Sequence, residues 1–443
     1  MHGDRRAGEA RSDMGEGVLT AGFRRRDGEL VCDDVSLTGI AAVVGTPTYV
    51  YSAGAVRGAY ARLAQALRGL PVHIHYAMKA NSNLALLQVV RECGAGVDVV
   101  SAGELHRARM VGFKGDDIVF AGVGKTRYDL EHALDVGVRC VNVESEAELE
   151  VLAEVATARG CVAPVSLRIN PGVVNVTAGH AYIATGEEGT KFGIPIMRGI
   201  DAAKRASTLP GIELIGLDMH IGSQIAEVAA FADAQQRLRA LLDAVRAEGI
   251  QSVRMIDVGG GFPVAYHDGE PVADLDAFAR VLRDTFGDAG VELIVEPGRY
   301  LVAEAGVLLT EVLYRKQSGS KRFMIVDAGM NDLLRPSHYE AHHEIEPVTD
   351  SQSPLETVDV VGPVCESGDF LALDRPIPDV GAGTLMAVRN AGAYGFVMSS
   401  NYNSRPRPAE VLVDGDQWGV VTPRETLDDL VRHERIVPEW RSA

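Results

Sequence analysis

The chain has 443 residues, of which 46% are hydrophobic and 23% charged, so it has the composition of a soluble globular protein and the length for two domains. Its 61 acidic residues outnumber 43 basic ones, and the net charge of −18 disfavours nucleic acid and anionic membranes as partners and favours a small-molecule substrate. The five cysteines are scattered without a CxxC pair, which argues against both a disulfide framework and a metal site.

Residues 1–17 are polar and rich in Gly, Arg, Asp and Glu, which predicts a disordered tail without a signal peptide. No apolar run in the chain approaches the roughly 20 residues of a membrane helix. We therefore expect a cytoplasmic protein. Short β-like pieces at residues 30–32 and 48–51 precede a helical pattern at residues 55–70.

The next stretch, residues 72–81, reads as a short strand that stops on Lys79 and opens into a turn. A lysine at the carboxyl end of a buried strand lies where active sites of parallel α/β folds collect. Taken alone, such a lysine is more often an exposed residue that ends a strand. The rest of the sequence has to decide between these two interpretations.

Apolar runs that read as buried strands then alternate with helical stretches. The predicted strands are residues 72–78, 97–101, 118–121, 140–143, 165–169, 214–219, 253–258 and 293–295. The helical stretches between them include residues 85–92, 102–110, 147–159, 230–248 and 275–286. Eight strands separated by helices predict an α/β fold with a (β/α)₈ TIM barrel over residues 47–306, and a doubly wound open sheet is the alternative.

After residue 307 the pattern changes to short β-prone pieces separated by Gly, Pro and Asp. These pieces are residues 308–314, 323–327, 357–362, 370–373, 384–389 and 410–414, and only residues 425–433 look helical. We therefore predict an all-β, barrel-like or sandwich-like domain formed by residues 307–443 and completed by β segments in residues 18–46.

Three further strand ends carry residues that could act chemically. One ends on His220, the next on the glycines 259–261, and the last on the run 296–299, Glu-Pro-Gly-Arg. Consecutive glycines allow backbone N–H groups to close on a phosphate, and barrels often bind phosphate at their late strands. Each motif also has a non-catalytic interpretation. His220 could be a structural histidine, the glycines a tight turn, and the run 296–299 an exposed salt bridge.

The loops of the β domain add two more candidates, Cys365 and Tyr394, although a lone cysteine is usually an inert buried thiol. Taken together, the motifs supply what a pyridoxal phosphate enzyme needs. These are a lysine, a glycine-rich phosphate cradle, an acid for the ring nitrogen and an arginine for a carboxylate.

The chain resembles the diaminopimelate decarboxylases, which are fold-type III, alanine-racemase-like pyridoxal phosphate enzymes. The resemblance extends from about residue 47 to residue 414, over the runs HYAMKANSN, NVESEAELE, KFGI, HIGSQI, DVGGGFP, EPGRYLV, VDAGMNDLLRPSHY, GPVCESGD and GAYGFVMSSNYNSRPRPAEVLV. Related ornithine and arginine decarboxylases share HIGSQ, GGG and EPGR. The LLRP, CESGD and SSNYNSRPRPAE runs are those that indicate diaminopimelate.

The resemblance implies pyridoxal 5'-phosphate as cofactor and assigns residues to it. Lys79 would hold the cofactor covalently, His220 would stack on its ring, and Glu296 would face the ring nitrogen. The phosphate would be held by Ser223, Gly259, Gly260, Gly261, Pro297, Gly298, Arg299 and Tyr394.

For the substrate, the resemblance implies that Arg299 and Arg335, with Tyr339, bind the distal carboxylate. It also implies that Glu366 binds the distal ammonium and that Tyr394 contacts the substrate. Cys365 would return a proton after CO₂ leaves. In the family, the residues corresponding to Cys365 and Glu366 come from a neighbouring subunit, which implies a homodimer with shared active sites.

The implied reaction is decarboxylation of meso-2,6-diaminoheptanedioate to L-lysine, the last step of lysine biosynthesis. Two alternatives stay open. One is a decarboxylase of another basic amino acid, of the D-lysine, ornithine or carboxynorspermidine type. The other is a non-catalytic homologue, which would be expected to lose Lys79 or Cys365, and this chain has both.

Overall fold

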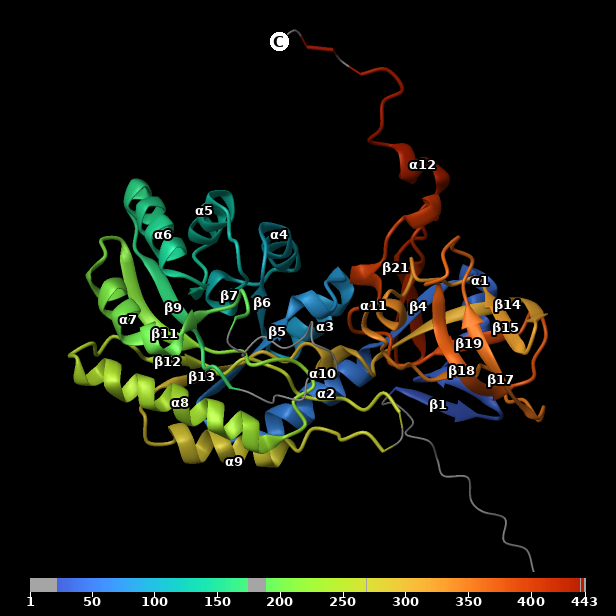
Figure 1. Ribbon diagram of the computed structural model, residues 1–443, viewed down its shortest axis with the longest axis horizontal. Helices are drawn as coiled ribbons and strands as arrows, with labels where there is room; N and C mark the ends of the chain where they lie inside the picture. The colour runs from blue at the N-terminus through green and yellow to red at the C-terminus, as the bar shows by residue number, and fades with distance from the viewer. Residues whose placement is uncertain (1–21, 174–188, 268, 439, 442–443) are drawn as a thin grey trace, which may run out of the picture.

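The computed structural model describes residues 22–173, 189–267, 269–438 and 440–441, and the predicted tail at residues 1–17 lies outside them. The molecule has two parts: a barrel surrounded by helices and a β-rich domain beside it (Figure 1). Within the described ranges, no helix combines the length and the apolar character needed to span a membrane.

The barrel is a closed ring of eight parallel strands. Its strands are β5 (Val72–Ala77), β6 (Gly96–Val99), β7 (Ile118–Phe120), β8 (Cys140–Val143), β9 (Ala163–Asn170), β11 (Ile212–Asp218), β12 (Met255–Asp257) and β13 (Glu292–Val295). A short strand, β10 (Ile194–Pro195), adds to β9. The ring closes because β13 pairs with β5 and β8 pairs with β9. The predicted TIM barrel is therefore confirmed, and the open-sheet alternative is excluded.

Helices cover the outside of the barrel (Figure 1). They are α2 (Ala53–Ala66), α3 (Leu84–Glu92), α4 (Ala102–Val111), α5 (Arg127–Val136), α6 (Glu146–Arg159), α7 (Gly199–Thr208), α8 (Val228–Ala247) and α9 (Leu275–Phe286), with the short α10 (Arg299–Val302) after β13. Local sequence signals set several ends. For example, Ser145 accepts a hydrogen bond from the backbone of the first turn of α6, and Gly160 ends that helix in a left-handed conformation.

The second domain is built on a mixed sheet in the order β18-β17-β15-β14-β4-β20-β21, with β19 and β16 paired beside β14. Its strands are β4 (Thr48–Ser52), β14 (Gly306–Ser318), β15 (Lys321–Val326), β16 (Ile345–Pro347), β17 (Leu355–Val361), β18 (Phe370–Pro378), β19 (Leu385–Val388), β20 (Ala409–Asp414) and β21 (Gln417–Thr422). A small sheet of β1 (Phe23–Arg26), β2 (Glu29–Cys32) and β3 (Val35–Ser36) accompanies it, with helices α1 (Leu37–Val44), α11 (Arg335–Tyr339) and α12 (Leu427–Val431). The predicted C-terminal β domain with N-terminal segments is confirmed.

Strand β4 belongs to this second sheet. It pairs with β14 on one side and with β20 on the other, and all five of its residues are buried. Residues 48–52 therefore lie in the β domain, and the barrel begins with α2 at Ala53 and not at the predicted residue 47. The chain thus enters the β domain, leaves it to form the barrel, and returns through β14.

Candidate active site

A cavity of about 670 Å³ lies at the carboxyl ends of the barrel strands. Lys79, on the single-turn 3₁₀ helix Met78–Ala80 that follows β5, lies in its wall. The predicted residues that line the cavity come from both domains: Lys79, His220, Ser223, Glu296, Arg299, Arg335, Tyr339 and Tyr394. The fold thus brings together side chains that are far apart in sequence.

The other predicted residues lie elsewhere. The turns after β12 and β13 lie directly behind cavity-lining side chains but do not line the cavity themselves. They are formed by Gly259, Gly260, Gly261, Pro297 and Gly298. Cys365 and Glu366 are exposed in the loop between β17 and β18, outside the set of residues that line the cavity.

The amine of Lys79 lies beside a buried acid. Its Nζ is 3.6 Å from Oδ2 of Asp98, whose side chain is fully buried in β6, whereas the Lys79 side chain is 39% exposed to the cavity. Burial disfavours the charged amine, but the negative charge of Asp98, together with that of Glu296, outweighs this effect and raises the pKa of Lys79. Asp98 therefore both fixes the amine and keeps it charged in the absence of a bound molecule.

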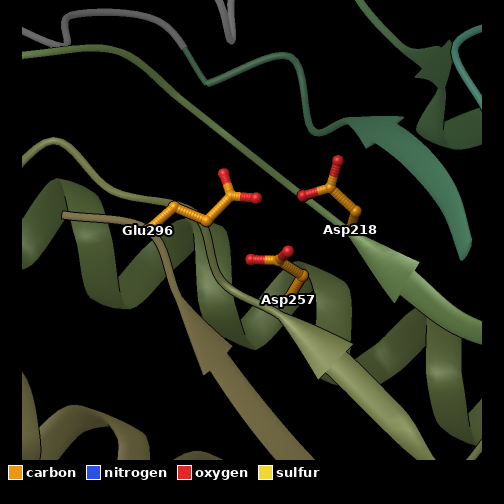
Figure 2. Close-up of side chains that lie close together, drawn as sticks. All are labelled: Asp218, Asp257 and Glu296. Carbon is orange, nitrogen blue, oxygen red and sulfur yellow. The ribbon is translucent and has the colours of Figure 1, made fainter. Parts of the chain in front are cut away.

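Three carboxylates converge next to this pair from the ends of neighbouring strands (Figure 2). Asp218 ends β11, Asp257 ends β12, and Glu296 follows β13, and their oxygen atoms lie within 4.8 Å of one another. Burial, followed by repulsion from the other acids, raises the pKa of Glu296 and of Asp218 well above the ordinary values. The pKa of Asp257 rises to about 6, again mainly through burial. A cation or an N–H donor placed here would be strongly stabilised.

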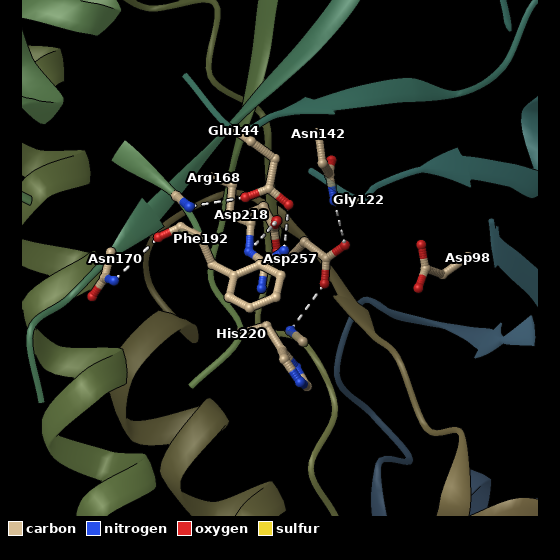
Figure 3. A network of polar contacts seen from close by, with 12 residues as sticks. Asp98, Gly122, Asn142, Glu144, Arg168, Asn170, Phe192, Asp218, His220 and Asp257 are labelled. Atoms are coloured by element: carbon tan, nitrogen blue, oxygen red, sulfur yellow. Dashed lines mark hydrogen bonds and ion pairs between the residues drawn. The ribbon is translucent and has the colours of Figure 1, made fainter. Parts of the chain in front are cut away.

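Arg168 partly balances these acids from β9 (Figure 3). Its side chain is buried, it donates to Glu144 Oε1 at 2.5 Å, and its Nε lies 3.9 Å from Oδ2 of Asp218. Its guanidinium also lies over the Phe192 ring, 5.0 Å from the centroid. Arg168 therefore pairs with Glu144 and Asp218, and its charge also interacts with that of Glu296.

His220 is held in one orientation by the glycine turn behind it. The backbone N–H of Gly260 donates to Nδ1 of His220 at 3.1 Å, so that nitrogen is an acceptor and carries no proton. Burial and the positive charges of Lys79 and Arg168 lower the pKa of His220 well below its usual value. The cavity is therefore bordered by a flat, uncharged imidazole.

The three glycines allow this close approach of neighbouring loops. A Cβ on Gly260 would lie 2.1 Å from the Glu296 carbonyl oxygen, and one on Gly261 would lie 2.5 Å from the Gly222 carbonyl oxygen. Gly259 has φ +71°, and a Cβ there would lie 2.6 Å from the Met219 carbonyl oxygen. Each glycine thus allows the close approach of a backbone carbonyl that belongs to, or directly precedes, a cavity-lining residue.

Substitution Gly260→Ala is expected to lower the free energy of unfolding by about 2 kcal/mol, because the added methyl group would overlap a backbone carbonyl that cannot move freely. Chemical denaturation measures this change. Gly381→Ala is the matched control, since no atom lies within 4 Å of a Cβ at that position. Equal stability of the two variants would contradict the close-approach role of Gly260.

Two buried arginines form the part of the cavity contributed by α10 and α11. Arg299 donates from Nε and Nη2 to Ser223 Oγ at 3.3 and 3.2 Å, and from Nη1 to Tyr266 Oη at 2.7 Å. Its guanidinium also lies 4.9 Å from the ring centroid of Tyr394. Arg335, at the start of α11, lies over the Tyr266 ring. Two guanidiniums in one cavity suit the binding of an anionic group.

The β domain reaches the site through the loop after β19. The backbone N–H of Tyr394 donates to the carbonyl of Ala80 at 2.7 Å, and Asn81 Nδ2 donates to the carbonyl of Gly392 at 3.0 Å. These bonds attach the Tyr394 loop to the turn that carries Lys79. The catalytic candidates of the two domains are therefore fixed to each other.

The sequence reasoning missed several charged residues of the site. Asp98, Asp218 and Asp257 lie in or at the ends of barrel strands, and Arg168 lies within β9. The signal that singled out Lys79, a charged residue at the carboxyl end of an apolar strand, could have found these acids too. Tyr266 and His343 lie in loops and carried no such signal.

Pyridoxal phosphate fits the residues that are present. Glu296 is 6% exposed, and its Oε1 has no hydrogen-bond partner in the described part of the chain, as expected for an acid that faces a ring nitrogen. The excess of buried acids suits a protonated ring, the neutral His220 suits a stacked ring face, and Ser223 with the Arg299 guanidinium suits a phosphate.

Comparisons with known proteins agree with this fit. A sequence model described as the pyridoxal-binding domain of pyridoxal-dependent decarboxylases matches residues 53–303. A diaminopimelate decarboxylase of Pseudomonas aeruginosa is 48% identical over 417 residues, 94% of this chain and 99% of its own length. The one from Aquifex aeolicus is 43% identical over 92% of this chain and 96% of its own.

Solved structures of diaminopimelate decarboxylases are also similar to this chain over nearly its full length. The Helicobacter pylori diaminopimelate decarboxylase complexed with L-lysine superposes with a TM-score of 0.86 at 38% identity, over 90% of this chain and 98% of its own. The M. jannaschii diaminopimelate decarboxylase in co-complex with L-lysine gives a TM-score of 0.89 at 34% identity, over 95% and 98%. The strand-end lysine, the cavity and these full-length matches together place the chain in the diaminopimelate decarboxylase family of pyridoxal-dependent decarboxylases.

Proposed function

We propose that this chain is a lyase that decarboxylates meso-2,6-diaminoheptanedioate to L-lysine and CO₂, with pyridoxal 5'-phosphate as cofactor, in lysine biosynthesis. The observation that carries the proposal is the composition of one cavity. It contains a strand-end lysine, a buried acid with one oxygen that has no hydrogen-bond partner among the described residues, and two buried arginines, Arg299 and Arg335. Such a cavity can hold both the cofactor and a substrate with two carboxylates.

The cofactor would be held from several sides. Lys79 would bind it covalently, and His220 would cover one face of its ring. Ser223, Arg299, Tyr394 and the turns formed by Gly259, Gly260, Gly261, Pro297 and Gly298 would surround the phosphate. Glu296 would face the ring nitrogen. When bound, pyridoxal phosphate supplies an electron sink for the electron pair left behind when CO₂ departs.

The residues of the chain then have separate tasks. Glu296 keeps a proton at the ring nitrogen, because a buried carboxylate strongly favours a neighbouring cation. Asp98 holds the Lys79 amine when it is not engaged, and Nζ to Oδ2 is already 3.6 Å. Displacement of water from this cavity strengthens each of these electrostatic contacts.

Substrate selection would depend on the end of the substrate that does not react. Arg299 and Arg335, with Tyr339 and Tyr394, would bind its carboxylate, and Glu366 would bind its ammonium. A basic amino acid without that second carboxylate would leave the positive charges of the buried guanidiniums without a bound anion, which lowers its affinity relative to diaminoheptanedioate. This favours diaminoheptanedioate over ornithine or D-lysine as substrate.

Cys365 and Glu366 would act from a second copy of the chain in a homodimer. Both are exposed and neither lines the cavity of its own chain, which supports a role in the site of a neighbour. Cys365 would then return a proton to the carbon that has lost CO₂.

Five free cysteines and the net charge of −18 are consistent with a cytoplasmic enzyme that binds neither membranes nor nucleic acid.

Hybrid complementation tests the shared site. Cys365→Ala and Lys79→Ala chains are each expected to be nearly inactive, because each lacks one group of the same reaction. Mixed after mild dissociation, they should form hybrid dimers with one intact site, and about a quarter of the wild-type activity should return if subunits exchange at random. Measurement of CO₂ release before and after mixing detects this. Mixtures that contain hybrids but stay inactive would contradict the shared site.

Substrate assays test the proposed reaction itself. Purified holoenzyme should release CO₂ from meso-2,6-diaminoheptanedioate and much more slowly from L-ornithine, D-lysine and L-arginine. Turnover of ornithine without turnover of diaminoheptanedioate would favour a decarboxylase of another basic amino acid. No turnover of any substrate, with cofactor bound, would favour a non-catalytic homologue.

A further inference from the structure

Tyr266 lies between the two arginines of the cavity, on the loop that connects β12 to α9. Three side chains hold the backbone of this loop. Gln224 exchanges two hydrogen bonds with the backbone of Val264, at 2.9 and 3.0 Å. Asn390 of the β domain donates to the Ala265 carbonyl at 2.9 Å, and the Tyr266 N–H donates to Glu270 at 2.6 Å. The position of the Tyr266 ring is therefore fixed from both domains.

Tyr266 contacts both arginines through its hydroxyl and through its ring. Its hydroxyl oxygen accepts from Nη1 of Arg299 at 2.7 Å, and its ring face lies 4.6 Å from the guanidinium carbon of Arg335. The tyrosine is 7% exposed and the two arginines are 7% and 6% exposed, so water contributes little to these contacts. A hydrogen bond from a charged donor and a cation–π contact are both strengthened by such burial.

His343 holds the guanidinium of Arg335 in place by a hydrogen bond. Its Nδ1 lies 2.8 Å from the Arg389 carbonyl, which can only accept, so Nδ1 carries the proton. Nε2 is then an acceptor and receives a hydrogen bond from Nη1 of Arg335 at 2.9 Å. Burial, followed by the charge of Arg335, lowers the pKa of His343 well below its usual value, in agreement with a neutral ring.

Without these partners the arginine pair would be unfavourable. Each guanidinium is buried, and the positive charge of Arg299 lowers the pKa of Arg335, after the larger effect of burial. An anionic substrate group would relieve this repulsion once bound, but the pair has to stay assembled before it arrives. Tyr266 contacts both guanidiniums, through its hydroxyl and its ring.

We propose that Tyr266 is a positioning residue that holds the Arg299 and Arg335 guanidiniums together to receive the carboxylate of the non-reacting end of the substrate. This inference rests on the proposed function and adds to it a residue that determines specificity. The charges of the two arginines, which outweigh the opposing effect of burial, also lower the pKa of Tyr266. The hydroxyl is therefore polarised by the pair that it joins.

Substitution Tyr266→Phe tests the proposal in the holoenzyme, because it removes the hydroxyl and keeps the ring. The KM for meso-2,6-diaminoheptanedioate and the Kd for L-lysine should each rise about tenfold or more, with kcat nearly unchanged. Binding of 1,5-diaminopentane, which lacks the carboxylate, should not change. The absorbance of the bound cofactor should also stay as in the wild type.

The matched control is Tyr51→Phe, which removes another buried hydroxyl bonded to a charged group, Glu410 Oε1 at 2.8 Å, away from the cavity. It should leave both ligand affinities unchanged. If Tyr266→Phe lowers stability, a double-mutant cycle with Arg299→Met still decides, since removal of the hydroxyl should have a smaller effect on ligand affinity when Arg299 is absent.

Three results would overturn the inference: unchanged L-lysine affinity, equal losses for L-lysine and 1,5-diaminopentane, or a fall in kcat with KM intact. Failure of the proposed function would look different. In that case the wild-type holoenzyme itself would neither turn over diaminoheptanedioate nor bind L-lysine. A wild type that does both, beside an unaffected Tyr266→Phe variant, contradicts the role of Tyr266 alone.

Discussion

Replacement of Lys79 by alanine should lower kcat by about a thousandfold or more, because it removes both the covalent attachment of the cofactor and a proton-transfer group. Lys79 is also the cation that faces Asp98 at 3.6 Å, so its loss leaves a buried acid without its nearest positive partner. CO₂ release measures the rate. The absorbance of the protein-bound cofactor, which depends on covalent attachment, should change at the same time.

Lys204→Ala is the control for this variant. Lys204 lies on α7, pairs with Glu248 at 2.8 Å, and is half exposed on the outside of the barrel. Its replacement should change neither kcat nor absorbance. A Lys79→Ala protein that keeps the wild-type absorbance and turns over substrate would show that another group holds the cofactor.

Glu296→Gln should lower kcat by about a hundredfold or more while preserving the shape of the cavity. Glutamine has nearly the same size as glutamate, but it cannot carry the negative charge that stabilises a protonated ring nitrogen. The cost falls on the step in which negative charge develops, so kcat should fall more than cofactor affinity. Steady-state kinetics and a cofactor titration of the apoprotein separate the two effects.

Glu410→Gln provides a comparison at a second buried acid. Glu410 lies on β20 and accepts from Tyr51 and Asn83 at 2.8 and 2.9 Å, and burial raises its pKa as it does for Glu296. It does not line the cavity. Glu410→Gln should therefore affect thermal stability and leave kcat almost unchanged. If Glu296→Gln kept full kcat with cofactor bound, the assignment of Glu296 to the ring nitrogen would be wrong.

The barrel could be predicted because its strands are buried on both faces and therefore read as continuous apolar runs. Predicted residues 140–143 coincide with β8, and residues 275–286 coincide with α9. Strand β4 was harder to assign, since its partners β14 and β20 lie on the far side of the barrel sequence. The five-residue α11 contains a proline, and no periodic pattern can indicate so short a helix.

The candidate site was predictable where a motif follows a strand. Lys79, His220 and Glu296 all do so, and all three line one cavity. Tyr266 and His343 come from loops, and their importance arises from contacts with arginines distant in sequence. Such roles depend on which side chains meet after folding, and a local pattern contains no information about that. The placement of Cys365 in a second copy likewise depends on a partner chain and stays a prediction.

The position of β4 has a consequence for how the chain is made. This strand is buried between β14 and β20, yet the entire barrel is synthesised before either partner leaves the ribosome. During translation the β4 segment, which is buried in the finished fold, stays unpaired while the barrel forms, and such an unpaired strand is a hazard for aggregation. The second sheet is completed last, when the C-terminal strands arrive. Chaperone dependence of the nascent chain should therefore centre on strand β4 and not on the barrel.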